Sequence, residues 1–155
     1  MKFKAKSLLL GICLALTLLA ANVPAVARST TGWNSFRVWS PLGADYCVGE
    51  SFGAAFNKCD FDINLTFEML VDTASYKNVT VIDSPGGYGT LTCAAASFSG
   101  VNDGIVSTPS QTFNPSGQQS LYFRGLPVYS GWGMSLYCWN VSPGRGIANI
   151  NWNPA

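Results

Sequence analysis

The stretch MSLYCWNVSPGRGIANINW, residues 134–152, predicts a β-hairpin and with it an all-β fold. Alternate residues of a strand lie on opposite faces. In the first half, one face carries Met134, Leu136 and Cys138, and the other carries Ser135, Tyr137, Trp139 and Val141. Both faces are largely apolar, which is typical of a strand that is covered on both sides. The turn residues SPGRG then separate it from a second strand.

The rest of the chain follows the same pattern of short runs separated by Gly, Pro and Asn. These runs are residues 33–40, 64–71, 76–83, 88–98 and 120–130. Several short strands at such spacing predict a β-sandwich, or a partly closed barrel, of about seven to nine strands. No segment has a helical period long enough for a strand–helix–strand unit.

One short helical turn is expected near Phe52–Phe56. Phe52, Ala55, Phe56 and Cys59 recur at the spacing of one helix face. Gly53 opposes this turn, because glycine costs a helix roughly 1 kcal/mol.

The first 27 residues have the three parts of an export signal. Three lysines precede an apolar run from Leu8 to Ala21, and the small residues Ala25 and Ala27 frame a cleavage site. The run has about 14 residues, fewer than the roughly 20 that a membrane-spanning helix needs. We therefore expect cleavage after Ala27, a single β domain at residues 28–155 without a membrane span, and a secreted or periplasmic location.

Four cysteines follow the expected signal: Cys47, Cys59, Cys93 and Cys138. An even number in an exported chain predicts two disulfides, with three possible pairings. A zinc site is not expected, because no two of these cysteines are two to four residues apart and the chain has no histidine. We favour Cys47–Cys59, which closes a local loop, and Cys93–Cys138, which joins distant strands and could tie two sheets together.

Charge and composition exclude several classes of function. Residues 28–155 contain six basic and eight acidic residues, a net charge of −2, with no basic stripe. Nucleic acid is not an expected partner, because phosphate contacts dominate such binding. The absence of histidine excludes His-dependent triads, Cys–His dyads and histidine-ligated zinc hydrolases. No cofactor is indicated.

Two short motifs resemble functional loops but lack essential members. Asp60, Asp62 and Asn64 alternate like the first ligands of a calcium loop, yet the required Gly and Glu at its sixth and twelfth positions are missing. Period-two spacing leaves another type of calcium site open, but a solvated strand face is the favoured interpretation, and no metal is predicted. The GESFG motif puts Ser51 at a nucleophile position without a histidine to accept its proton.

Carboxylates are the remaining candidates for catalysis. A glycosidase needs two carboxyl groups about 5–10 Å apart, and the spacing of the eight acidic residues singles out no pair. Glu68 lies in an apolar strand, where burial would make it a candidate general acid. The alternative is that Glu68 faces outward between Phe67 and Met69. Glu50 is the second candidate.

Aromatic residues are the candidates for binding. In VYSGWGMS, residues 128–135, Tyr129 and Trp132 lie among Gly and Ser, which favours exposure. Exposed rings stack on sugars or anchor a protein partner. We expect Trp139 in the core instead. Arg145 lies between glycines and is expected at an exposed hairpin tip, where it would either contact an anionic group or serve solubility.

These patterns favour an exported, non-catalytic binding module. Its partner would be a glycan or an extracellular protein, contacted by Trp132, Tyr129 and Arg145. Two other classes stay open. One is a polysaccharide hydrolase that uses two carboxylates, and the other is a small inhibitor that inserts a disulfide-held loop, such as Cys47–Cys59, into a secreted hydrolase.

Overall fold

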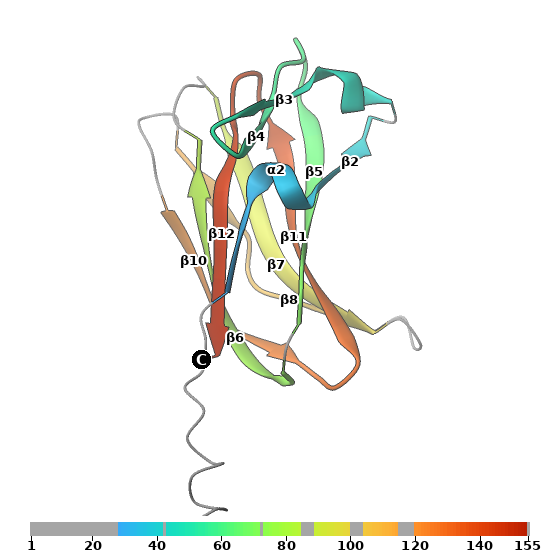
Figure 1. Ribbon diagram of the computed structural model, residues 1–155, viewed down its shortest axis with the longest axis vertical. Helices are drawn as coiled ribbons and strands as arrows, with labels where there is room; N and C mark the ends of the chain where they lie inside the picture. The colour runs from blue at the N-terminus through green and yellow to red at the C-terminus, as the bar shows by residue number, and fades with distance from the viewer. Residues whose placement is uncertain are drawn as a thin grey trace, which may run out of the picture.

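The computed structural model describes residues 28–41, 43–71, 73–84, 89–99, 104–114 and 120–154. Within these ranges the chain folds into two antiparallel β-sheets that pack face to face (Figure 1). The predicted sandwich is therefore confirmed. The expected signal, residues 1–27, lies outside the described residues.

Each sheet has six strands. Sheet A has the order β10 (Ser120–Val128), β6 (Ser75–Asp83), β12 (Gly146–Pro154), β4 (Ala54–Asn57) and β3 (Val48–Ser51), and β1 (Arg28–Thr31) also pairs with β12. Sheet B has the order β2 (Phe36–Ser40), β5 (Ile63–Met69), β11 (Trp132–Val141), β7 (Leu91–Ser99) and β8 (Ile105–Ser107), and β9 (Gln111–Phe113) also pairs with β7. The described ranges thus contain twelve strands, more than the seven to nine predicted. Strands of three or four residues are too short for alternation to reveal them.

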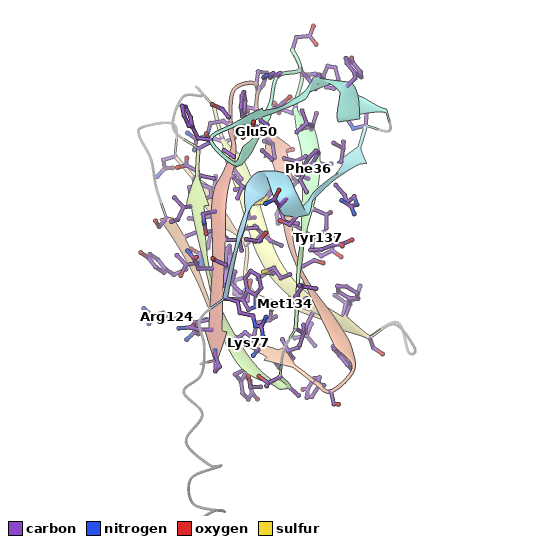
Figure 2. The ribbon with its side chains drawn as sticks, in the orientation of Figure 1. Phe36, Glu50, Lys77, Arg124, Met134 and Tyr137 are labelled. Carbon is purple, nitrogen blue, oxygen red and sulfur yellow. A yellow bond between two sulfur atoms is a disulfide. The ribbon has the colours of Figure 1, made fainter. Side chains whose placement is uncertain are left out.

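The inner faces of the two sheets form the core. Met134, Leu136 and Cys138 of β11 are at most 1% exposed, as the alternation predicted. Met134 and Lys77 point between the sheets, whereas Arg124 points away from them (Figure 2). Trp139, which we expected in the core, is only half-buried, because it lies on the other face of β11.

A bulge near the end of β11 changes which face its last residue occupies. The register with β5 shifts between Cys138 and Val141, and Asn140 has a φ of 53°. Val141 is fully buried in the core as a result, so our placement of it on the face of Tyr137 is wrong. One extra residue in a strand reverses the faces that follow it.

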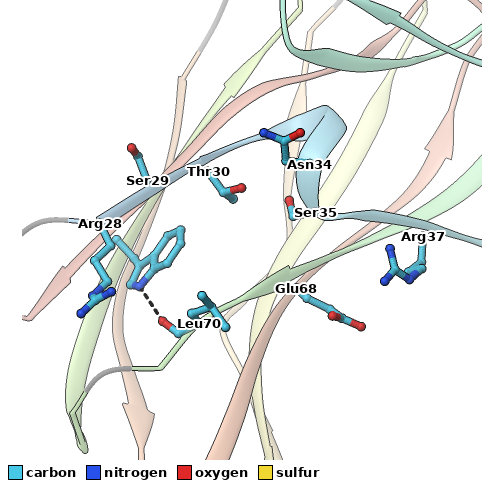
Figure 3. A pocket seen from close by; sticks show the side chains of 9 residues that line it. Arg28, Ser29, Thr30, Asn34, Ser35, Arg37, Glu68 and Leu70 are labelled. Carbon is cyan, nitrogen blue, oxygen red and sulfur yellow. Dashed lines mark hydrogen bonds between the residues drawn. The ribbon is translucent and has the colours of Figure 1, made fainter.

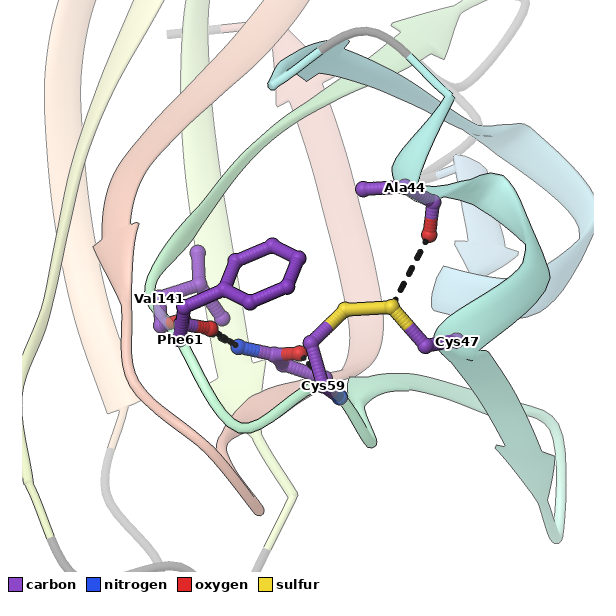
Figure 4. The surroundings of a disulfide bond; sticks show 6 residues. Ala44, Cys47, Cys59, Phe61 and Val141 are labelled. Carbon is purple, nitrogen blue, oxygen red and sulfur yellow. Dashed lines mark hydrogen bonds between the residues drawn. A yellow bond between two sulfur atoms is a disulfide. The ribbon is translucent and has the colours of Figure 1, made fainter.

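Both predicted disulfides are confirmed. Cys47–Cys59 links the short 3₁₀ helix η1 (Ala44–Cys47) to the residues after β4 (Figure 4). Cys93 and Cys138 lie directly opposite each other on β7 and β11. This second bond therefore joins neighbouring strands of one sheet and does not tie the two sheets together. Two disulfides in a chain of this size are typical of exported proteins.

The helical turn predicted near Phe52–Phe56 is wrong. β3 and β4 form a hairpin there, and Phe52 and Gly53 make its turn with φ values of 50° and 81°. A two-residue hairpin turn of this kind needs positive φ at both central positions, which glycine permits. In the part of the chain that the structure describes, the α-helical segment is instead α2 (Gly32–Ser35). Across the described residues, no helix has the length and apolar character to cross a membrane.

Candidate functional site

The turn between β10 and β11 brings two of the predicted ligand-binding residues together. The ring centroids of Tyr129 and Trp132 are 4.9 Å apart, and the rings meet edge to face at 70°. The turn is closed by a hydrogen bond from the N–H of Trp132 to the carbonyl oxygen of Tyr129 (3.1 Å). Tyr129 is 54% exposed, whereas Trp132 packs partly against the core. Trp132 therefore packs against the Tyr129 ring and is less exposed to solvent than we expected.

A pocket of about 230 Å³ lies between Tyr129 and a second exposed tyrosine, Tyr76. Tyr76 is on β6 and pairs with Pro127 of β10. We call this site, which is lined by residues 74–76 and 127–130, the aromatic pocket. Ser97 of the other sheet donates a hydrogen bond to the carbonyl oxygen of Pro127 (2.5 Å), which fixes the end of β10 beneath it. Alternation alone did not indicate Tyr76, because its importance depends on its neighbour across the sheet.

A larger and more polar cavity of about 420 Å³ lies at the other edge of sheet A (Figure 3). We call it the polar cleft. Its lining comes from five elements and one loop: Arg28, Ser29 and Thr30 of β1, Asn34 and Ser35 of α2, Arg37 of β2, Glu68 of β5 and Leu70 after it, and Trp152 of β12. Trp152 is 5% exposed, and its indole N–H donates to the carbonyl oxygen of Leu70 (3.2 Å).

The two glutamates considered for catalysis lie in different sheets. Glu68 faces outward from β5, which confirms the alternative interpretation, and its carboxylate lines the polar cleft. Glu50 of β3 accepts a hydrogen bond from the N–H of Gly53 (2.7 Å) and stabilises the hairpin turn. Ser51 ends a strand that enters this hairpin, so it lacks the strand-to-helix turn of a nucleophile elbow.

Arg145 is not at an exposed tip, and our expectation for it is wrong. The residue is 1% exposed, and its guanidinium donates to the buried carboxylate of Asp83 (Nη2–Oδ2 2.6 Å). The turn folds back against β4, because the Gly144 N–H donates to the carbonyl oxygen of Asn57 (2.7 Å) and the Asn57 N–H donates to that of Arg145 (2.8 Å). A buried charge needs a partner of opposite sign. Arg145 therefore has a structural role, and we remove it from the candidate ligand contacts.

The side chains considered for calcium do not converge. Asp60 and Asp62 are exposed, and the side-chain oxygen of Asn64 accepts a hydrogen bond from the N–H of Asn140 (3.1 Å). In the part of the chain that the structure describes, no group of three or more acidic, cysteine or histidine residues could hold a metal ion.

Comparison with known proteins gives a fold but no family. No protein-family model matches the sequence, and neither does any curated protein. Solved structures do match. The CBM22-1–GH10 modules of Clostridium thermocellum xylanase 10B, complexed with xylohexaose, give a TM-score of 0.55 at 11% identity, over 86% of this chain and 29% of that chain.

Two isolated modules also match. TmCBM61 with β-1,4-galactotriose gives a TM-score of 0.50 at 11% identity, over 83% of this chain and 88% of that one. CBM35 from Paenibacillus barcinonensis gives 0.50 at 10% identity, over 83% and 99%. The fold is therefore the β-sandwich found in these carbohydrate-binding modules.

Proposed function

We propose that the protein is an exported, non-catalytic glycan-binding module. The observation that carries this proposal is the aromatic pocket, in which two exposed tyrosines flank a shallow depression on a sandwich of this type. One module with the same fold, TmCBM61, forms a complex with an oligosaccharide, β-1,4-galactotriose. The two disulfides fit an exported location. We further propose that residues 1–27 direct export and that residues 28–155 are the mature domain.

The chemistry of the aromatic pocket suits a sugar ring. The apolar faces of a sugar stack on aromatic side chains, and a tyrosine adds a hydroxyl group that hydrogen-bonds at the wet edge. A volume of about 230 Å³ is smaller than pockets for drug-sized ligands, so it suits a single ring of a longer chain. The edge-to-face contact with Trp132 restricts the Tyr129 ring before a ligand binds, which lowers the entropic cost of binding.

One assay separates binding from hydrolysis. Oxidised protein comprising residues 28–155 would be incubated with insoluble xylan, mannan, galactan and cellulose, and both loss of protein from the supernatant and release of soluble sugar would be measured. We expect loss of protein without release of sugar. Release that disappears in Glu68→Gln or Glu50→Gln would contradict the proposal and favour the two-carboxylate hydrolase.

A second candidate, an inhibitor of a secreted hydrolase, is favoured by one observation. The loop closed by Cys47–Cys59 contains the β3–β4 hairpin, and the Phe52 side chain at its tip is fully exposed. A rigid loop with an exposed aromatic residue resembles the anchors that dominate protein interfaces. An inhibitor would slow xylanase, mannanase or cellulase activity at a stoichiometric ratio, and Phe52→Ala would remove this effect. Absence of such inhibition, together with polysaccharide binding, would exclude this candidate.

A further inference from the structure

The polar cleft is separate from the aromatic pocket. The two sites share no lining residue. β1 borders the cleft at one edge of sheet A, and β10 carries the aromatic pocket at the other, with β12 and β6 between them. Three strand spacings correspond to roughly 14 Å. The cleft volume of about 420 Å³ is within the usual range for ligand sites.

Three charged side chains line the cleft: Arg28 on β1, and Arg37 and Glu68 on the neighbouring strands β2 and β5. Arg37 on β2 pairs with Thr66 on β5, so Glu68 is two residues further along that strand on the same face. Among the described residues, Arg37 and Glu68 form no ion pair with each other, and the Arg37 Nη1 donates to the carbonyl oxygen of Phe36 (2.9 Å). The remaining guanidinium donors and the carboxylate acceptors are thus available to a ligand.

This combination favours a hydroxyl-rich ligand. Guanidinium donors and a carboxylate acceptor are both present, and a hydroxyl group both donates and accepts hydrogen bonds. Adjacent hydroxyls of a sugar can satisfy a carboxylate and a guanidinium together. The amide of Asn34 adds a donor and an acceptor of the same kind.

The apolar part of the cleft lining comes chiefly from Leu70, with the largely buried Trp152 beside it. The hydrogen bond to the carbonyl oxygen of Leu70 fixes the indole of Trp152 (Figure 3). The Leu70 side chain itself is 79% exposed beside the cleft. Polar groups above a small apolar surface match the amphipathic character of a sugar ring.

We propose that the polar cleft is a second glycan-binding site and that it makes the module bivalent. The bivalence rests on the proposed function of the aromatic pocket, but glycan binding at the cleft rests on the cleft alone. Two sites at opposite edges of a sheet allow one molecule to bind two glycan chains and raise its overall avidity on a polysaccharide.

The test follows each site separately by NMR. Xylotetraose, mannotetraose, cellotetraose and β-1,4-galactotetraose would be titrated into ¹⁵N-labelled protein comprising residues 28–155. With at least one of these sugars, we expect chemical-shift changes around Glu68. Glu68→Gln and Arg37→Gln should each reduce the affinity measured from these changes at least tenfold. Tyr129→Ala should leave these shifts unchanged, and the control Arg124→Gln, which alters an exposed arginine on β10, should change neither site. Unaltered unfolding midpoints would establish that the variants fold.

Each outcome decides one proposal. Shifts around Tyr129 without shifts around Glu68 would overturn the second site and leave the proposed function intact. Shifts around Glu68 alone would support the cleft and contradict the aromatic pocket. Bivalence additionally requires that the wild type aggregates a soluble polysaccharide and that Glu68→Gln does not.

Discussion

The Asn57 side chain joins the loop that follows β4 to the end of β11. Its Nδ2 donates to the carbonyl oxygens of Phe61 and Val141, and its Oδ1 accepts the N–H of Cys59, each at 2.7 Å (Figure 4). The residue is fully buried. A buried donor or acceptor that loses its partner costs about 1–3 kcal/mol.

Asn57→Ala is therefore expected to lower the free energy of unfolding by about 3 kcal/mol, because buried backbone groups lose their partners. Urea denaturation measures this change. Asn153→Ala, which alters an exposed asparagine of β12, is the matched control and should change stability by less than about 0.5 kcal/mol. Equal effects of the two substitutions would contradict the role that we assign to Asn57.

The buried pair of Arg145 and Asp83 gives a second prediction at this scale. Arg145→Met removes the guanidinium that faces the buried carboxylate, and we expect a loss of about 3–5 kcal/mol. The double variant Arg145→Met/Asp83→Leu should recover most of that loss, because it removes both buried charges. If the double variant were less stable than the single one in guanidinium denaturation, the pair would not be the reason for the loss.

Arg145 also shows where reasoning from sequence fails. Glycines on both sides and a turn motif predict an exposed tip, and nothing nearby in the sequence indicates a carboxylate 62 residues earlier. Tyr129 was predicted correctly as exposed, because its local Gly and Ser neighbours decide that property. The exposure of Tyr129 was predictable from its local sequence, and the pairing of Arg145 with Asp83 was not.

At the scale of the elements, the turn of the β3–β4 hairpin holds Phe52 in a backbone conformation and a solvent exposure that are both unfavourable for a bulky apolar residue. Its φ of 50° is uncommon for a bulky residue, and its side chain is fully exposed. Asn-Gly is the preferred sequence for a two-residue turn with positive φ at both positions.

Phe52→Asn should therefore raise the unfolding temperature by a few degrees, since asparagine tolerates this conformation better. Gly53→Ala should lower it, because Gly53 has a φ of 81°. Differential scanning calorimetry compares the two. A lower melting temperature for Phe52→Asn would mean that Phe52 makes a stabilising contact that the hairpin geometry does not reveal.

The element scale also explains which parts of the fold the sequence predicted. Period-two alternation predicted the sandwich and the buried face of β11. The spacing of the cysteines predicted both disulfide pairs. The bulge at Asn140 and the turn at Phe52 were missed. A residue with positive φ exchanges the faces of a strand at Asn140 and reverses the chain direction at Phe52, and neither change alters the apolar pattern of the sequence. The polar cleft was missed because it combines β1, α2 and β5 from distant parts of the chain.

In the whole molecule, the proposed glycan-binding sites lie at one end of β10 and at the far edge of sheet A. Three similarly exposed tyrosines allow a test of the first site, because two line the aromatic pocket and the third lies outside it as a matched control. Tyr76 and Tyr129 line the aromatic pocket, while Tyr122 lies on β10 outside it, and all three are between 54% and 61% exposed.

The most direct measurement of the central claim is the affinity of the three tyrosine-to-alanine variants for the polysaccharide that the wild type binds best. We predict that Tyr76→Ala and Tyr129→Ala each weaken binding about tenfold, equivalent to roughly 1.4 kcal/mol, while Tyr122→Ala matches the wild type. Equal affinity of all three variants and the wild type would contradict the claim that the aromatic pocket binds glycan.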